Sequence, residues 1–294
     1  MNNQFTKKEA PIQGFAGMGG GAVGRLLTSS GVALGNRSLR FNSSDTTNLT
    51  RTFSSSGNRQ SWTWSGWVKR SALVASERQV LFGGYGSNSD TEWLEFGFGQ
   101  NNETDDSVYM TTSSINQGST AVFRDLAAWY HYLVNYDGSN LKIYINNVLT
   151  LTKSLTGDRG INGNWSHTIG KSPANTIRWF NGYLTDVYFV DGSTLTPSSF
   201  GAADSNGVWQ RSTYSGSYGT NGFHILDFAN NETIGSDTSG NGNTFTANNF
   251  STTAGSGNDV LFDFPTNDTE NTDSGAGGEV TGNYACINPL LKPD

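Results

Sequence analysis

The feature that most constrains the fold is a β-hairpin pattern between Trp129 and Leu149, WYHYLVNYDGSNLKIYINNVL. In both halves, residues 129–136 and 141–146, alternate side chains share one face, which is the period of two that a strand imposes. The DGSN sequence at 137–140 lies between them, and glycine and Asx residues accept the positive φ angles of a hairpin reversal. We therefore expect two antiparallel neighbours. The side chains expected in the core are Leu133, Ile143 and Ile145.

Short runs of the same kind recur from residue 38 to about 200, separated by Gly, Asn, Ser and Asp turns, the spacing typical of a β-sandwich. Thirty-seven glycines and only 15% charged residues also favour a turn-rich β protein over a helical bundle. The predicted fold class is all-β, an antiparallel β-sandwich of jelly-roll type. Residues 37–200 form the sandwich, residues 1–36 an extended glycine-rich arm, and residues 201–294 an acidic C-terminal extension with a few strands.

Three phrases resemble laminin-G-like modules of the concanavalin A-like lectin/glucanase superfamily. They are the hairpin itself (Trp-x-His, Tyr-Asp-Gly, then Leu-x-Ile-Tyr-Ile-Asn-Asn), an earlier strand that ends in Trp-Val-Lys at 67–69, and the late strand within 179–192. In the family the second hairpin strand usually ends in Asn-Gly. Here Asn147 stands in place of that glycine, and asparagine tolerates a left-handed conformation well. The resemblance covers residues 38–200 and implies a lectin-like binding module.

The N-terminal segment reads as a docking arm. It is rich in glycine and carries isolated anchors at Phe5, Ile12, Phe15, Arg25 and Leu26, a pattern that suits a segment that orders along a partner. The alternative is a simple linker or frayed terminus. Residues 1–70 hold nine Lys/Arg against two Asp/Glu, whereas residues 201–294 hold two against eleven. This asymmetry suits docking on an acidic surface, and because no dense basic run occurs, we do not expect nucleic-acid binding.

The C-terminal sequence FDFPTNDTENTDSGAGGEVTGNYACINPLL resembles a phrase that recurs beside such modules in virion proteins of marine tailed phages. This implies a structural virion component, a tail fibre, capsid decoration or adhesin. It would bind other virion proteins through the arm and a host-surface glycan through the sandwich. Because fibres and decorations are commonly trimeric, the resemblance also implies a homo-oligomer, for example a trimer. The single cysteine, Cys286, fits assembly in a reducing host cytoplasm, and the simpler alternative is that Cys286 is a small hydrophobic residue in a packed segment. We expect neither a signal peptide nor a membrane span.

An enzyme is the main alternative, namely a polysaccharide-degrading subunit of the glucanase type. Glycoside hydrolysis needs two carboxyl groups across the scissile bond. The nearest phrase, Glu92-Trp-Leu-Glu95, separates its carboxylates by three residues, so on a strand they face opposite ways. We therefore assign no catalytic residue, and we expect Glu95 on the solvent side of its strand. The three histidines are expected to be hydrogen-bonded structural residues. A secreted bacterial adhesin is a further alternative.

Sugar binding needs an aromatic ring that stacks on the apolar face of the sugar, with amides or carboxylates nearby. The turns between the expected strands supply such groups. The candidate carbohydrate-binding residues are Tyr85, Trp93, Asn162 and Trp165.

The competing role for a tryptophan is to fill the core. We expect that role for the tryptophans that lie in strand-like runs, whereas Trp165, within GNGNWSH, is expected to be exposed. The tryptophans expected in the core are Trp62, Trp64, Trp129 and Trp179.

The one cofactor that the sequence suggests is a bound calcium ion. Asp237, Ser239, Asn241 and Asn243 offer oxygen ligands at alternating positions, as calcium prefers. No glutamate follows at the spacing of an EF-hand, and Asp, Asn and Gly clusters are also ordinary turn residues. Calcium binding and a plain turn therefore both remain open.

Overall fold

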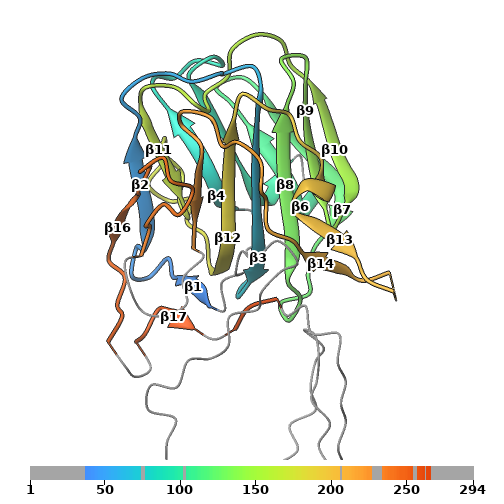
Figure 1. Cartoon of the computed structure of the whole chain (residues 1–294), viewed down its shortest axis with the longest axis vertical. Helices are drawn as coiled ribbons and strands as arrows, with labels where there is room; N and C mark the ends of the chain where they lie inside the picture. The colour runs from blue at the N-terminus through green and yellow to red at the C-terminus, as the bar shows by residue number, and fades with distance from the viewer. Residues whose placement is uncertain are drawn as a thin grey trace, which may run out of the picture.

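The computed structural model of the chain describes residues 37–265, except 74–76, 102–103, 206, 227–233, 254–256 and 262. These residues form two antiparallel sheets packed face to face, which confirms the expected all-β sandwich (Figure 1). Apart from one 3₁₀ turn, η1 (Pro197–Ser199), the regular elements in this part of the chain are strands. The arm anchors from Phe5 to Leu26 and Cys286 lie outside the described residues.

The first sheet contains the hairpin of residues 129–149, one strand in from its edge. Its strand order is β10 (Val148–Ser154), β9 (Asn140–Ile145), β8 (Tyr130–Tyr136), β3 (Trp62–Arg70), β12 (Gly182–Asp191), β1 (Ser38–Phe41) and β17 (Val260–Leu261), with β15 (Phe223–Ile225) also paired to β12. The predicted hairpin is confirmed, because β8 and β9 pair antiparallel from Tyr132–Ile145 to Tyr136–Leu141. Gly138 and Asn147 have φ angles of 81° and 68°, as the turn pattern predicted.

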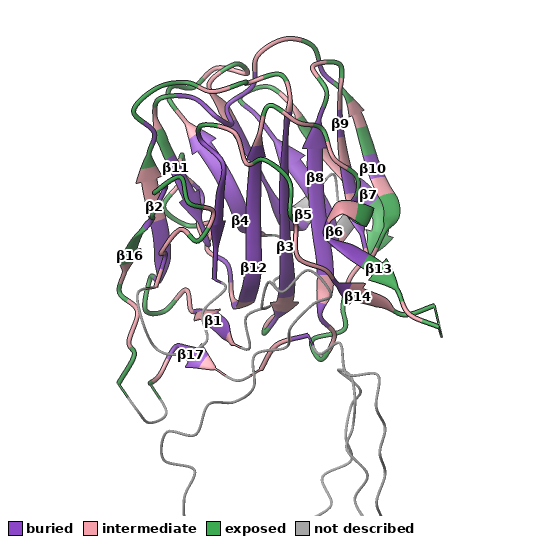
Figure 2. Ribbon diagram, viewed as in Figure 1, coloured by how far each residue is buried: buried purple, intermediate pink, exposed green. Residues whose placement is uncertain are grey.

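The second sheet lies across the core from the first. Its order is β16 (Thr246–Asn248), β2 (Asn48–Thr52), β11 (Ser166–Ile169), β4 (Arg78–Tyr85), β5 (Trp93–Asn101), β6 (Thr104–Thr111) and β7 (Asn116–Val122). A small hairpin of β13 (Gly201–Ala203) and β14 (Trp209–Arg211) forms a separate two-stranded sheet. The long central strands are buried, and exposed residues concentrate in loops and at edges such as β10 (Figure 2).

The core is built from few, large rings, because alternate positions of both sheets point into the same space. Trp64 lies near its centre, with ring centroids 5.3 Å from Phe96, 6.1 Å from Tyr132 and 6.2 Å from Phe82. Trp62 and Trp64 are fully buried in this cluster, as expected, and Ile143 and Ile145 also belong to it. Trp129 is also buried, with 5% of its surface exposed, but it does not belong to this cluster. Its indole Nε1 donates to Asp263 Oδ1 at 3.2 Å.

A second, smaller cluster covers the outer face of the first sheet. Leu133 lies there with Tyr188, Val190 and Phe200, not between the two sheets as its expected core position implied. The reason is that β8 is buried on both faces. The segment from η1 to β14 covers the outer face of β8, so even the outward-facing side chains of β8 are excluded from water.

The described part of the C-terminal third completes the sandwich. β15 pairs with β12, β16 with β2, and β17 with β1. Because β1 and β17 are antiparallel neighbours, Ser38 and Leu261 lie opposite one another. Figure 1 shows both strands at one end of the sandwich, and the loops that follow β2, β4 and β10 at the other end.

Candidate functional site

Three loops meet at the end of the sandwich opposite β1 and β17. They are residues 53–61 between β2 and β3, 86–92 between β4 and β5, and 155–165 between β10 and β11. The strand register brings them together, because Ser166 pairs with both Thr52 and Tyr85, and Tyr85 pairs with Trp93. Residues more than a hundred positions apart thus share one surface, which we name the loop end.

An open depression of about 630 Å³ lies at the loop end. Its lining is wholly polar or glycine and comes from the first and third loops. The lining residues are Ser56, Gly57, Asn58, Arg59, Gln60, Ser61 and Asp158. Ser56, Asn58 and Gln60 are exposed. Asn58 Oδ1 accepts from the backbone N–H groups of Gln60 and Ser61, and Ser56 Oγ accepts from the Asn164 N–H.

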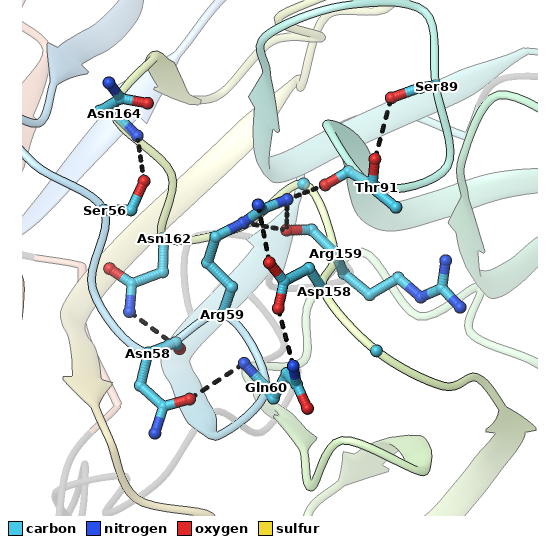
Figure 3. A network of polar contacts seen from close by, with 12 residues as sticks. Ser56, Asn58, Arg59, Gln60, Ser89, Thr91, Asp158, Arg159, Asn162 and Asn164 are labelled. Atoms are coloured by element: carbon cyan, nitrogen blue, oxygen red, sulfur yellow. Dashed lines mark hydrogen bonds and ion pairs between the residues drawn. The ribbon is translucent and has the colours of Figure 1, made fainter.

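Arg59 and Asp158 join the two sides of this depression (Figure 3). Arg59 Nη1 donates to Asp158 Oδ2 at 3.0 Å, Nε donates to the Arg159 carbonyl at 3.1 Å, and Nη2 donates to the carbonyls of Thr91 and Arg159. Gln60 Nε2 donates to Asp158 Oδ1 at 2.9 Å. The Asp158 side chain is 43% exposed, and an ionised carboxylate accepts about four hydrogen bonds, so acceptor capacity remains for a ligand.

Trp165 is partly buried beside this network. The Arg59 guanidinium lies 4.6 Å from the centroid of its ring, and the indole Nε1 donates to the Gly160 carbonyl at 2.8 Å. Gly86 and Gly163 also pack so closely that a Cβ at either position would lie within 3 Å of the ring. The expected exposed ring is therefore half-buried and contributes an edge, because neighbouring groups occupy the space that a stacking sugar would need.

Asn162 does not face the depression. It is fully buried with a φ of 68°, and its Nδ2 donates to the Asn58 carbonyl and to Asp191 Oδ1, while its Oδ1 accepts from Asn221 Nδ2. These bonds fix loop 155–165 against loop 53–61. In this structure Asn162 supports the site from beneath instead of contacting a ligand.

His167 holds the same loop in place. Its Nε2 accepts from the Asn162 backbone N–H at 3.0 Å, and its Nδ1 lies 2.9 Å from the Trp165 carbonyl, to which it donates. Burial lowers the pKa of His167 to about 4, so the ring is neutral at physiological pH. This confirms the expected structural role for this histidine.

Tyr85 and Trp93 form a pair on the outer face of the second sheet, with ring centroids 6.1 Å apart in an edge-to-face arrangement. Both side chains are partly exposed. They lie next to the loop end but do not line the depression. The structure therefore separates the four sugar-binding candidates into a surface pair, a half-buried ring and a buried amide.

Glu95 is the clearest correction on this face. It does point outward from β5, but it is fully buried, because residues 171–178 cover the outer face of the strand. Arg178 Nη1 lies 2.7 Å from Glu95 Oε1, and Ser172 Oγ donates to Oε2. Glu95 is thus a paired structural carboxylate.

Asp90 organises the neighbouring turns. It accepts from Thr112 Oγ1 at 2.6 Å, from the Ser114 backbone N–H at 2.8 Å and from Ser114 Oγ. Burial alone would raise the pKa of Asp90, but these hydrogen bonds and the charge of Arg159 outweigh it and lower the pKa. Asp90 therefore stays ionised and joins loop 86–92 to the turn after β6.

A second depression, about 410 Å³, lies near the opposite end of the sandwich and includes Glu77, Arg78, Ile177 and Trp179 in its lining. Trp179 is only half-buried there, with Lys171 Nζ 5.5 Å from its ring centroid and its Nε1 donating to the Thr176 carbonyl. The expected core position of Trp179 is wrong, because the residue lies in the covering loop before β12 and not within the strand.

The proposed calcium ligands form a closed turn. Asp237 accepts four hydrogen bonds, from the backbone N–H groups of His224, Ser239 and Asn243 and from Ser239 Oγ. Asn241 Nδ2 donates to the carbonyls of Gly219 and Gly222. Across the described residues, no three His, Cys, Asp or Glu side chains gather to hold a metal ion. Calcium stays an untested hypothesis, and an ion at Asp237 would have to displace some of these donors.

Sequence reasoning missed Arg59, Gln60 and Asp158, which carry most of the contacts of the depression. Their local sequences are ordinary polar loops, and their pairing spans about a hundred residues. Only the three-dimensional register brings them together.

The described residues contain no helix with the length and apolar character needed to span a membrane.

Comparison with known proteins identifies the family of the sandwich. The model of the family described as the concanavalin A-like lectin/glucanases superfamily matches residues 41–199, more than half of the chain. No curated protein matches.

Similar solved structures include domain 4 of an arabinanase from Geobacillus stearothermophilus in complex with arabinotriose (20% identity, TM-score 0.37, covering 48% of this chain and 65% of that one). A second is a heptameric SAP-like pentraxin from Limulus polyphemus (17% identity, TM-score 0.42, covering 56% of this chain and 80% of that one). A third is the pair of domains LG4-5 of the mouse laminin α1 chain (11% identity, TM-score 0.39, covering 54% of this chain and 42% of that one).

Proposed function

Because the chain belongs to the concanavalin A-like lectin/glucanase superfamily, we propose that it is a non-catalytic glycan-binding module that binds through the depression at the loop end. The observation that carries the proposal is the composition of this depression. Asp158 offers a half-exposed carboxylate, and Asn58 and Gln60 offer exposed amides. Sugar hydroxyls both donate and accept hydrogen bonds, so this set matches them.

Binding is favoured over hydrolysis because the depression contains one carboxylate, Asp158. The second depression also contains one, Glu77. Both glycosidase mechanisms need a pair of carboxyl groups on opposite sides of one bond. Glu95, the other carboxylate considered from the sequence, is buried and paired with Arg178.

The test is a screen of the purified protein on a printed glycan panel, followed by calorimetry with the strongest binder. Asp158→Asn should weaken binding at least tenfold, because it removes the ionised acceptor, while the melting temperature changes little, since partly exposed ion pairs contribute about 0–1 kcal/mol. The matched control is Glu77→Gln, an exposed carboxylate at the opposite end. Unchanged affinity in Asp158→Asn, or release of reducing sugar by the wild-type protein, would refute the proposal.

We further propose that the module is a structural component of a tailed-phage virion, a fibre, decoration or adhesin whose N-terminal arm docks to the particle. The sequence of the arm and the C-terminal phrase support this setting. The arrangement of the sandwich is compatible with the virion setting, because β1 and β17 lie together at the end away from the depression. An assembly anchored through the chain ends would then direct the loop end outward.

The virion proposal has its own test. Electron microscopy of purified particles, together with mass spectrometry of their proteins, should locate the chain on the particle surface and show its copy number. Its absence from purified particles would overturn this setting without affecting the glycan-binding proposal.

A further inference from the structure

We infer that the loop end selects uncharged glycans and discriminates against glycans that carry carboxylate or sulfate groups. This inference rests on the proposed glycan-binding function and names its ligand class. It comes from the charges that surround the depression, considered one group at a time.

The two cations of the loop end, Arg59 and Arg159, already donate hydrogen bonds to groups of the protein. Arg59 donates four hydrogen bonds, to Asp158 and to backbone carbonyls, and its flat face lies against Trp165. Arg159 is buried, 8% exposed, and donates to the carbonyls of Asp90 and Thr156. A guanidinium binds a carboxylate or sulfate most strongly through two parallel N–H groups, and neither arginine presents such a free fork.

Two carboxylates of the loop end, Asp191 and Asp90, are held mainly by neutral hydrogen-bond donors and not by cations. Asp191 accepts from the backbone N–H groups of Asn58 and Asn221 and from Asn162 Nδ2, so its charge is bound by neutral donors. Asp90 is likewise held mainly by the hydroxyls of Thr112 and Ser114.

Glu92, beside Gly86, adds a further partly exposed carboxylate. The three loops and the end of β12 therefore hold more carboxylates than cations. The resulting field is negative, and it attracts cations and repels an approaching anion.

The groups that line the depression point to the same class. Asp158 can only accept, so it needs a ligand that donates, and a sugar hydroxyl does so. A ligand carboxylate or sulfate offers no proton at neutral pH. Placed beside Asp158, it would bring two like charges together, and the nearest cation, Arg59, already donates to Asp158 and to backbone carbonyls.

The experiment compares matched ligands. Neutral oligosaccharides from the panel and the same oligosaccharides capped with sialic acid are titrated into the full-length protein by calorimetry. We expect the neutral member of each pair to bind at least tenfold more tightly in 20 mM salt. Salt screens exposed charges, with a screening length of about 8 Å at 0.15 M and about 3 Å at 1 M. The ratio of the two affinities, neutral over sialylated, should therefore shrink as the salt concentration is raised. A purely steric exclusion would not respond to salt.

Two variants sharpen the test. Glu92→Gln, which lies outside the lining of the depression, should narrow the ratio between neutral and sialylated ligands, and Glu77→Gln at the opposite end should leave that ratio unchanged. Equal or tighter binding of sialylated ligands that is still lost in Asp158→Asn would overturn the inference and leave the proposed function standing. If no glycan binds, or Asp158→Asn has no effect, the proposed function fails and the inference fails with it.

Discussion

Asp137 is the residue that closes the hairpin between β8 and β9. Its Oδ1 accepts from the backbone N–H groups of Ser139 at 2.9 Å and Asn140 at 2.6 Å. Asp137→Ala should lower the free energy of unfolding by about 1 kcal/mol, since two turn hydrogen bonds are lost while their donors gain access to water. Urea denaturation measures this change. Selective loss of glycan binding by a folded variant would contradict the purely structural role.

The same carboxylate gives a pH dependence. Burial alone would raise the pKa of Asp137, but the two backbone hydrogen bonds and Lys142 outweigh it, so the folded pKa lies below 3.8. The stabilisation is therefore present above pH 3.8 and is lost as the pH falls through the folded value. The difference in unfolding free energy between wild type and Asp137→Ala should therefore disappear as the pH falls from 3.8 through the folded pKa of Asp137.

Two buried histidines set the stability at milder acid. His131 lies between Ser65 Oγ, 2.8 Å from its Nε2, and Trp209 Nε1, which donates to its Nδ1 at 2.9 Å. Burial lowers the pKa of His131 to about 3 and that of His167 to about 4. Below pH 6.5 the unfolded chain binds protons that the folded chain does not. Stability should thus fall by up to about 1.4 kcal/mol per pH unit for each histidine between pH 6.5 and 4.

Denaturation curves across this pH range, with NMR titration of the imidazole signals, check the histidine prediction. Substitution of His167 by Gln should remove about half of the slope. A titration midpoint near 6.5 for either ring in the folded protein would contradict it.

Single residues show where sequence reasoning reaches its limit. The alternation of β5 correctly placed Glu95 on the outer face, but it could not reveal that residues 171–178 cover that face. Asn162 was a reasonable surface amide in a glycine-rich loop, and only its contacts with Asn58 and Asp191 show that it is buried. Local pattern gives the direction of a side chain, and long-range packing decides its exposure.

At the scale of elements, the β13–β14 hairpin is attached to the first sheet by a buried ion pair. Arg211 Nη1 lies 2.6 Å from Asp186 Oδ2, and each side chain is 2% exposed. Burial alone would raise the pKa of Asp186, but Arg211 and His224 outweigh it and lower the pKa. Asp186 lies at the irregularity in the pairing of β12 with β3, with a φ of 47°, a conformation that Asp and Asn tolerate.

Removing one partner of this pair should be costly. Arg211→Met should lower the free energy of unfolding by about 3–5 kcal/mol, because Asp186 is left as a buried charge. The double variant Arg211→Met with Asp186→Asn should recover much of that loss. Arg124→Met is the matched control, since Arg124 is 58% exposed and Arg70 also pairs with its partner Asp106. Additive effects of the two substitutions at 186 and 211 would contradict the buried pairing.

The strands predicted best from the sequence were those with large alternating side chains, such as β8, β9 and β3. β7, with the sequence NQGSTAV, has no apolar period, and it pairs only as an edge strand beside β6. The short β13 and β14 were missed for the same reason. Their stability comes from Trp209 and Arg211, which reach partners on other strands.

At the scale of the whole molecule, the family resemblance ended at residue 200, but five described hydrophobic residues beyond it belong to the same core. Phe223, Ile225, Leu226, Phe245 and Val260 are each at most 3% exposed and pack in the main cluster. The sequence showed possible strands in this region. It could not show which sheet each would join, because the pairing of β17 with β1 joins positions more than two hundred residues apart.

A chain cut after residue 200 should therefore fail to fold. It would lose β15 from β12, β16 from β2 and β17 from β1, and it would open the core where Phe223 and Phe245 now contact each other, with ring centroids 4.8 Å apart. Truncating a single buried phenylalanine costs about 3–5 kcal/mol, and whole domains are stable by only about 5–15 kcal/mol. Residues 37–265, as the control, should unfold cooperatively and show dispersed NMR amide signals. Cooperative unfolding of residues 37–200 alone would show instead that the C-terminal strands only decorate a complete sandwich.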